Sequence, residues 1–352
     1  MQRRGFLAGL AALTLPPPSW AEAGSPAFLA AGKRGEAFVL HGLSAAGESV
    51  FDIALPGRGH AAAAHPQQPF AVAFARRPGV FALVIDCRSG QIAHRLSPPD
   101  GRQFNGHGVF SADGAILYTS EVIAETSEGR IGLWDGVQFT RLGEWASGGI
   151  GPHDIRLRGD GTLIVANGGI ATDPTDRSKL NLATMRPNLT QISAEGDILA
   201  QAELMPELAQ NSIRHLAIGR DGRVAFAMQW EGEPTEPVPL LGLWQPGQAP
   251  ELCPARQDEA FLMRGYAGSI AMTGGGKIAI TSPRGGVVMI HAMDGSPIAT
   301  HHRTDVCGLA AMGDGFVLSD GTGRLWSCDE AALRPLRKDG PAWDNHLVTL
   351  TT

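Results

Sequence analysis

Short apolar runs joined by tight turns recur along the chain, and one of the clearest is residues 104–118, FNGHGVFSADGAILY. In this stretch a histidine opens an apolar run, an Asp-Gly turn follows, and a second apolar run returns. Two apolar runs joined in this way are typical of an antiparallel β-hairpin. Similar hairpins begin near Ile150, Ser212 and, with a looser match, Asp305. A hairpin repeated every roughly 40 to 60 residues predicts a β-propeller, in which the hairpin is the inner half of each blade.

The two ends of this pattern complement each other. Three apolar strands, at 27–33, 37–44 and 49–55, have no inner strand before them, and the chain closes on a single strand at 345–350. These four segments make one blade if the last strand pairs with the first, which also removes exposed sheet edges. The sequence therefore predicts an all-β, seven-bladed propeller closed by pairing the C-terminal strand with the N-terminal strands. A pair of β-sandwiches is the alternative, which the regular repeats disfavour.

Residues 1–23 have the features of an export signal. Arg3 and Arg4 precede an apolar stretch at 6–15, and Ala-Glu-Ala at 21–23 forms a cleavage motif, which together favour a twin-arginine signal peptide. A membrane anchor is the alternative, but ten apolar residues followed by prolines are too few to span a bilayer. We therefore expect a signal at 1–23, one propeller domain at 24–352, a periplasmic location and no membrane span in the mature chain.

Composition narrows the function classes. The formal net charge is −6 and no basic cluster is present, which argues against nucleic acid as a partner. The 46 glycines and 24 prolines fit many short strands and turns rather than helices. The four cysteines, in an oxidising compartment, leave a disulfide open without predicting one. They are Cys87, Cys253, Cys307 and Cys328.

Histidines recur at one position of the repeat, and this position carries the candidate chemistry. The first strand of a propeller blade lines the central channel, so side chains at this position would surround one mouth of it. Imidazole suits Cu, Zn, Fe or Ni, and a thiolate favours Cu or Zn over Ca or Mg. The alternative is that each histidine only bonds a neighbouring carbonyl and holds its blade. The predicted metal ligands are His60, His107, His153, His215, Cys307 and His346, with Gly268 or Ser269 in the remaining blade. The candidate accessory residues are Glu121, Asp154, Asn167, Arg214, Arg264, Arg284 and Asp344.

Three connections between second and third strands are long, at 121–129, 168–187 and 229–239. The topology places these connections beside the histidines, and they are rich in Asp and Glu. Long loops on a rigid scaffold are common binding elements, so we expect a lid or a docking surface there, although solvated loops are ordinarily acidic. In the second loop, Leu180, Leu182 and Met185 are expected to face water until a partner covers them.

Several segments resemble the signature blocks of a known bacterial family, among them GHGVFSADG, SGGIGPHDIRL, SIRHLAIG, TSPRGG and WDNHL. The family consists of exported propellers catalogued as a domain of unknown function, and the resemblance spans nearly the whole mature chain. Members carry a twin-arginine signal and are commonly encoded beside imelysin-type periplasmic iron-uptake proteins and a di-haem oxidoreductase. The resemblance implies a role in periplasmic iron or copper handling, with imelysin-type proteins as partners.

A more distant likeness is to the propeller of nitrous oxide reductase, whose seven histidines hold a copper cluster. This chain has five histidines and one cysteine at the matched positions and no appended cupredoxin domain, so that reductase activity is not implied.

The function expected from the sequence is binding of a transition metal, iron or copper, at the histidine mouth of a periplasmic propeller, in metal uptake or handling. One alternative is a metal-free interaction scaffold of an iron-uptake system. Another is an enzyme, either a metal-dependent oxidoreductase or a lactonase-like hydrolase in which Glu121, Asn167 and Asp320 imitate calcium ligands. The sequence does not decide whether the protein is an enzyme.

Overall fold

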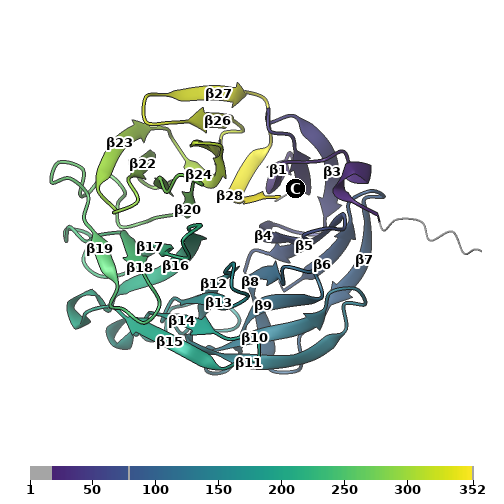
Figure 1. Cartoon of the computed structure of the whole chain (residues 1–352), viewed down its shortest axis with the longest axis horizontal. Helices are drawn as coiled ribbons and strands as arrows, with labels where there is room; N and C mark the ends of the chain where they lie inside the picture. Colours follow the sequence, from purple (N-terminus) through teal and green to yellow (C-terminus); the bar gives the residue numbers. More distant parts are fainter. Residues whose placement is uncertain (1–17, 78–79, 351–352) are drawn as a thin grey trace, which may run out of the picture.

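Seven four-stranded antiparallel sheets surround a central channel in the computed structural model, which describes residues 18–77 and 80–350 (Figure 1). The predicted seven-bladed propeller is therefore confirmed. Each blade is numbered here by its order along the chain, and its innermost strand lines the channel.

The first three blades take in both ends of the described chain. Blade 1 consists of β28 (Ala342–Thr349), β1 (Phe28–Arg34), β2 (Ala37–Leu43) and β3 (Ser49–Leu55). Blade 2 consists of β4 (Gly59–Ala64), β5 (Phe70–Ala75), β6 (Ala82–Asp86) and β7 (Gln91–Leu96). Blade 3 consists of β8 (Arg102–Phe110), β9 (Ile116–Ile123), β10 (Glu128–Asp135) and β11 (Arg141–Ile150).

The other four blades follow in sequence order. Blade 4 consists of β12 (Pro152–Leu157), β13 (Leu163–Asn167), β14 (Asn188–Ile192) and β15 (Ile198–Glu203). Blade 5 consists of β16 (Asn211–Ile218), β17 (Val224–Trp230), β18 (Leu241–Trp244) and β19 (Glu251–Cys253). Blade 6 consists of β20 (Ser269–Met272), β21 (Ile278–Ser282), β22 (Val287–His291) and β23 (Pro297–His302). Blade 7 consists of β24 (Val306–Met312), β25 (Gly315–Asp320), β26 (Leu325–Cys328) and β27 (Leu333–Arg337).

Blade 1 closes the ring as the sequence predicts. Strand β28 pairs antiparallel with β1, with Phe28 opposite Thr349 and Ala30 opposite Leu347. The yellow end of the chain thus lies beside its purple beginning in Figure 1. Pairing the two ends of the chain fills an edge that would otherwise offer unpaired N–H and C=O groups to another molecule.

Burial along the strands explains why the sequence shows apolar runs rather than clean alternation. The second strands β13 and β17 are buried at every position, because each is covered on both faces by neighbouring blades. The outer strand β7 is mostly exposed. The apolar runs therefore come from the inner and middle strands of each blade.

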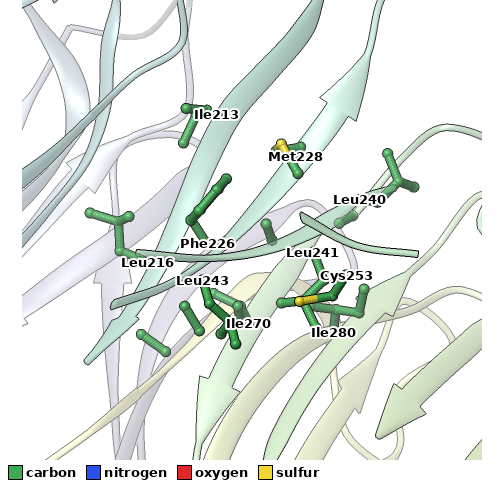
Figure 2. Close-up of a cluster of buried hydrophobic side chains, with 14 of the residues drawn as sticks. Ile213, Leu216, Phe226, Met228, Leu240, Leu241, Leu243, Cys253, Ile270 and Ile280 are labelled. Atoms are coloured by element: carbon green, nitrogen blue, oxygen red, sulfur yellow. The ribbon is translucent and has the colours of Figure 1, made fainter. Parts of the chain in front are cut away.

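The most extensive described core cluster joins blades 4, 5 and 6. Figure 2 shows Phe226 of β17 at its centre, with Leu216 of β16 and Ile270 of β20 nearby. Phe226 is fully buried, as is Trp244 of β18. Burying side chains of this kind contributes about 1.5 to 3 kcal/mol each, and this fixes each inner strand against its neighbour.

The end of the predicted signal packs against the propeller. A short 3₁₀ helix spans Trp20–Ala23, and both of these residues are buried in the cluster shared by blades 1 and 2. Trp20 donates a hydrogen bond from Nε1 to the carbonyl of His65 at 2.8 Å. Residues 1–17, which include the paired arginines, lie outside the described residues. Among the residues described, no helix is long and apolar enough to cross a membrane.

The four cysteines are all free and buried. Burial raises the pKa of Cys87 and Cys328 to about 12 and that of Cys253 to about 11, so these thiols stay protonated at neutral pH. No disulfide joins them in the described structure.

Candidate metal centre

Five inner strands that follow one another around the ring bring one histidine each to the channel. Strands β20 and β24, which complete the ring, carry Ser269 and Cys307 at the corresponding place. The histidines are His346 of β28, His60 of β4, His107 of β8, His153 of β12 and His215 of β16. The five histidines that the aligned repeats predict to meet therefore lie together at the channel.

Irregular pairing marks the histidine position in these strands. The register between first and second strand shifts between Gly59 and Ala62 in β4, and between Phe104 and Gly108 in β8. Similar shifts occur at His153 in β12 and at His215 in β16. A bulge puts an extra residue into one strand and changes the direction of its side chain. The bulges allow the imidazoles to converge on the axis, and nothing in the apolar pattern signals them.

The imidazole rings lie in mutual contact. Ring centroids of His60 and His346 are 4.6 Å apart, and those of His153 and His215 are 4.7 Å apart. His107 lies centrally, 4.9 Å from His60 and from His153 and 4.8 Å from His346. Burying so many ring nitrogens in one place costs free energy unless each has a hydrogen-bond partner or a ligand.

Two groups of three histidines could each hold a metal ion. Within each group the ligand atoms lie within 4.8 Å of one another, and His107 belongs to both. The first group is His60, His107 and His153, and the second is His107, His215 and His346. All three members of the second group are buried.

Oxygen acceptors lie beside Nδ1 of two rings. Nδ1 of His107 lies 3.3 Å from Oδ1 of Asp154, and Nδ1 of His153 lies 3.0 Å from the carbonyl of Arg214. Both oxygens can only accept, so they favour the tautomer with the proton on Nδ1 and the lone pair on Nε2. Metal-binding histidines are commonly oriented in this way by a carboxylate or a carbonyl.

Asp154 is itself held in place. Its Oδ2 accepts from the backbone N–H of Leu216 at 3.0 Å, across the interface between blades 4 and 5. Burial alone would raise the pKa of Asp154, but Arg156 and then His107 bring it below its ordinary value. The carboxylate is therefore charged at neutral pH and fixes the ring of His107.

Burial keeps the other rings neutral. It lowers the pKa of His215 to about 3. It also brings the pKa of His60, His153 and His346 well below the ordinary value, with neighbouring cationic groups adding to the effect. A neutral imidazole is the form that binds metals.

Within the described histidine cluster, two buried ring nitrogens are left without a hydrogen-bond partner. Nδ1 of His60 and Nε2 of His346 are buried and accept or donate no hydrogen bond. Nε2 of His60 and Nε2 of His107 are 3.2 Å apart. Two nitrogens bound tetrahedrally to one zinc-sized ion at about 2.05 Å would be about 3.3 Å apart. The contact is a hydrogen bond between the two rings, and the same spacing also fits imidazoles that share an ion.

A cavity of about 200 Å³ lies over the cluster, with His60, His153 and His215 among its lining residues. Connections between second and third strands form its walls, as the sequence predicts. Loop 168–187 supplies Thr172 and Arg177. The cluster is thus open to one mouth of the channel.

Comparison with known proteins adds the family and the fold. Residues 53–350 match the family model described as Protein of unknown function (DUF1513). The chain belongs to this family. No curated protein matches the chain. The family description for DUF1513 carries no activity, so the histidine geometry has to be interpreted by itself.

Solved structures similar to this DUF1513 chain share its fold at low sequence identity. Hydrazine synthase of Kuenenia stuttgartiensis superimposes with a TM-score of 0.65 at 14% identity, covering 90% of this chain and 96% of that one. The WD40 repeats of RRP9 give a TM-score of 0.62 at 14% identity, covering 90% and 88%. At such identities the likeness establishes the propeller fold alone.

Cys307 lies apart from the two histidine groups of the DUF1513 propeller. It belongs to neither of them. Its sulfur packs against Gly268, the residue directly before β20, where an added Cβ would be 3.0 Å from Sγ. Burial raises the pKa of this thiol, with Arg76 acting in the opposite direction. In the metal-free protein the group is therefore a protonated thiol at neutral pH.

Three polar residues at the ends of second strands bond to neighbouring side chains of the protein, and one of these bonds joins blade 4 to Ser147 of blade 3. Glu121 is fully buried and pairs with Arg141 at 2.6 Å. Asn167 bonds to Ser147 and Thr190. Asp320 is likewise buried and pairs at 2.6 Å with Arg303, which lies in the connection between β23 and β24.

The remaining accessory residues separate into two sets. Arg214 and Arg284 line the cavity, whereas Arg264 is exposed and does not. Asp344 accepts from Arg58 at 2.8 Å and from Arg76 at 3.1 Å.

The loops differ from expectation in two respects. The first expected long loop is only residues 124–127, because the ladder between β9 and β10 continues through Glu121 and Val122. Met185 is buried at 2% exposure, so the expectation that it faces water is wrong, whereas Leu180 is 61% exposed. Met185 fills space under its own loop.

The cavity also holds residues that the sequence did not single out. Arg76 and Arg77 follow β5, and Arg177 lies in loop 168–187. The sequence does contain a signal for the first two, because an Arg-Arg pair follows a predicted second strand at the end that faces the histidine mouth.

Proposed function

We propose that this protein binds a transition-metal ion at its inner-strand histidines. The observation that carries the proposal is the convergence of His107, His215 and His346, whose ligand atoms lie within 4.8 Å of one another in a buried place. Imidazole nitrogens suit Cu, Fe, Zn or Ni, whereas Ca and Mg prefer oxygen ligands.

The surroundings of the cluster support the proposal. Asp154 and the carbonyl of Arg214 direct two lone pairs inward, and His60 and His346 each have a buried nitrogen with no partner among the described residues. A bound ion would satisfy these atoms, and it would reach them through the cavity that His60 and His215 line. The chain's residues would hold and orient the ion without supplying a charged ligand.

We further propose that the protein serves iron or copper handling in the periplasm, with an imelysin-type protein as its partner. Support comes from the twin-arginine features of residues 1–23 and from the resemblance of its signature blocks to exported propellers. Leu180 on the rim loop is 61% exposed at the same mouth, which makes it the apolar side chain to test for contact with the partner.

Metal content of untagged protein is the direct test. Elemental analysis should find iron or copper at a fixed ratio to protein, and His107→Gln should lose it, because His107 belongs to both groups. The matched control is His302→Ala, which removes an exposed histidine of β23. Thermal melting of both variants checks that they fold.

Equal metal content in folded His107→Gln and in wild type would overturn the metal proposal. The protein would then be better described as a metal-free scaffold. The partner is tested separately by pull-down with an imelysin-type protein, in which Leu180→Ser should reduce recovery and leave metal content unchanged. Equal recovery with Leu180→Ser would place the partner surface elsewhere.

A further inference from the structure

The cavity over the histidines concentrates positive charge. Its lining residues include six cationic side chains and one carboxylate, Glu231, so their formal sum is 6 − 1 = +5. This contrasts with the chain as a whole, whose net charge is −6. The cationic residues are Arg76, Arg77, Arg177, Lys179, Arg214 and Arg284.

Within the described part of the chain, two of the six have a carboxylate partner. Arg76 pairs with Asp344 at 3.1 Å, and Lys179 pairs with Glu231. No carboxylate of the described residues lies within ion-pair distance of the other four. These four are Arg77, Arg177, Arg214 and Arg284.

The inner arginines are positioned by neutral groups. Arg77 donates from Nη1 to Oδ1 of Asn105 at 2.7 Å and from Nη2 to Oγ1 of Thr172 at 2.6 Å. Arg214 lies directly before His215, and its Nε approaches Oε1 of Gln229 at 3.4 Å. These acceptors fix the guanidinium groups without neutralising them.

The arginines act on one another electrostatically. Burial, then Arg177 and Arg214, lower the pKa of Arg77 to about 10. Desolvated like charges in one cavity are costly, and an anion placed between them would offset that cost.

The rim carries two further arginines. Arg177 donates from Nη1 to the carbonyl of Arg77 at 2.9 Å, so one loop is tied to the next. The guanidinium of Arg284 lies 4.2 Å from the ring centroid of Tyr266. A guanidinium stacked on an aromatic face keeps its N–H groups at the edge free for a ligand.

We propose that this cavity binds a small polyanion through its carboxylate or phosphate oxygens, held by Arg77 and Arg214 with Arg177 and Arg284 at the rim. Arginine forks match the geometry of both kinds of oxyanion. The cavity has room for roughly a dozen water molecules, which suits a tricarboxylate or a phosphate rather than a polymer. The inference does not depend on a metal at the histidines, although an anion in this position would border His60, His153 and His215.

The test is calorimetric titration of metal-free protein, prepared with a resin-bound chelator so that no soluble chelator competes. Separate titrations with citrate and with inorganic phosphate distinguish a polycarboxylate from a phosphate ligand, and acetate is the monovalent control. We expect saturable 1:1 binding of citrate or phosphate that weakens as sodium chloride is raised. Absence of saturable binding by both oxyanions would overturn the proposal.

Charge-removing variants test the location. Arg77→Gln and Arg214→Gln should each weaken binding by about tenfold or more, since each removes a charge-assisted hydrogen bond. The matched control is Arg264→Gln, which removes an exposed arginine two residues from Tyr266 but outside the cavity. If Arg214→Gln does not fold, Arg284→Gln at the rim replaces it.

Each outcome separates the anion from the metal. Anion binding should persist in His107→Gln, because His107 does not line the cavity. Equal affinity in wild type, Arg77→Gln and the folded second variant would overturn the proposed site. An equal loss in Arg264→Gln would show attraction by general surface charge and would overturn it as well.

Discussion

The two ends of the central channel hold cavities of similar size that are lined by different side chains. The cavity at the histidine mouth measures about 200 Å³ and is lined by arginines, histidines and polar loop residues. The cavity at the far mouth measures about 210 Å³ and is lined mostly by apolar residues such as Leu216, Ala310 and Leu347. Among the described residues around the far cavity, Arg156 alone is charged.

The same inner strands run past both cavities, so the difference comes from local structure rather than from the fold. At the far mouth, paired strands continue regularly into tight turns, as Ala310 opposite Val317 shows. At the histidine mouth, bulges interrupt the pairing and longer loops add side chains from several blades. A rigid scaffold with irregular structure at one end confines chemistry to that end.

The largest effect is expected from removing the strand that borders both cavities. Deleting residues 343–352 removes most of β28, which pairs with β1 and carries His346 and Leu347. The truncated chain should lose cooperative melting and aggregate, because one sheet edge and the channel wall become exposed. Differential scanning calorimetry and size-exclusion chromatography measure this.

His346→Ala is the control for that truncation, because it keeps the strand. A truncated chain that melts at the temperature of the full chain would contradict the closure of the ring by β28.

Introducing a carboxylate at each mouth in turn should change the free energy of unfolding by very different amounts. Ala310→Asp puts an unpaired charge into the far cavity at a buried position and should lower the free energy of unfolding by about 3 to 5 kcal/mol. Thr172→Asp puts the same group beside Arg77 and should change it by no more than about 1 kcal/mol. Urea denaturation of both variants measures the difference, and equal losses would mean that the mouths do not differ electrostatically.

Lowering the pH should reduce the free energy of unfolding through Asp320, the last residue of β25 at the histidine-mouth end. Burial would raise the pKa of Asp320, but bonds from Thr322, Trp326 and Arg303 bring it below its ordinary value. A lowered folded-state pKa means that this stabilisation is complete above the unfolded-state value of about 3.9 and is lost as pH falls through the folded value.

Asp320→Asn should therefore cost about 1 to 3 kcal/mol of the free energy of unfolding at pH 7. The gap between variant and wild type should narrow below about pH 4. Urea denaturation as a function of pH measures it, and a gap that stays constant down to pH 2 would show that the charge of Asp320 is not responsible.

The smallest effect is expected from Cys307, the residue of β24 at the histidine position. Cys307→Ser should leave the metal content of the protein unchanged, because the thiol belongs to neither histidine group. Elemental analysis gives the result. Loss of metal in a folded Cys307→Ser protein would show that the sulfur is a ligand after all.

The sequence carries the fold well, because each blade repeats the same apolar hairpin and because unpaired strands remain at both ends. It also identifies the five histidines, since one position recurs in the repeat. It does not reveal the bulges, because they leave the apolar pattern unchanged.

The arginine cavity is hidden from the sequence for a different reason. Arg77, Arg177 and Arg284 lie in loops of three different blades, and only the closed ring brings them together. The sequence predicts that Glu121 lies in a loop, but strand β9 extends through it. Arg141 pairs with its carboxylate and neutralises the charge. Whether a side chain at a strand end lies in the sheet or in a loop depends on how far the pairing of the strands continues, and the composition does not specify this.

Because His346 lies in the last described strand, the two histidine groups form at different times during synthesis. A ribosome makes the chain from its N-terminus, and His60, His107 and His153 belong to successive blades 2, 3 and 4. Their group can form once those blades have folded. The group of His107, His215 and His346 needs β28, the last of the described strands, to pair with β1. An unfinished chain could therefore offer an ion only the first group, and the second would appear at the moment the circle is complete.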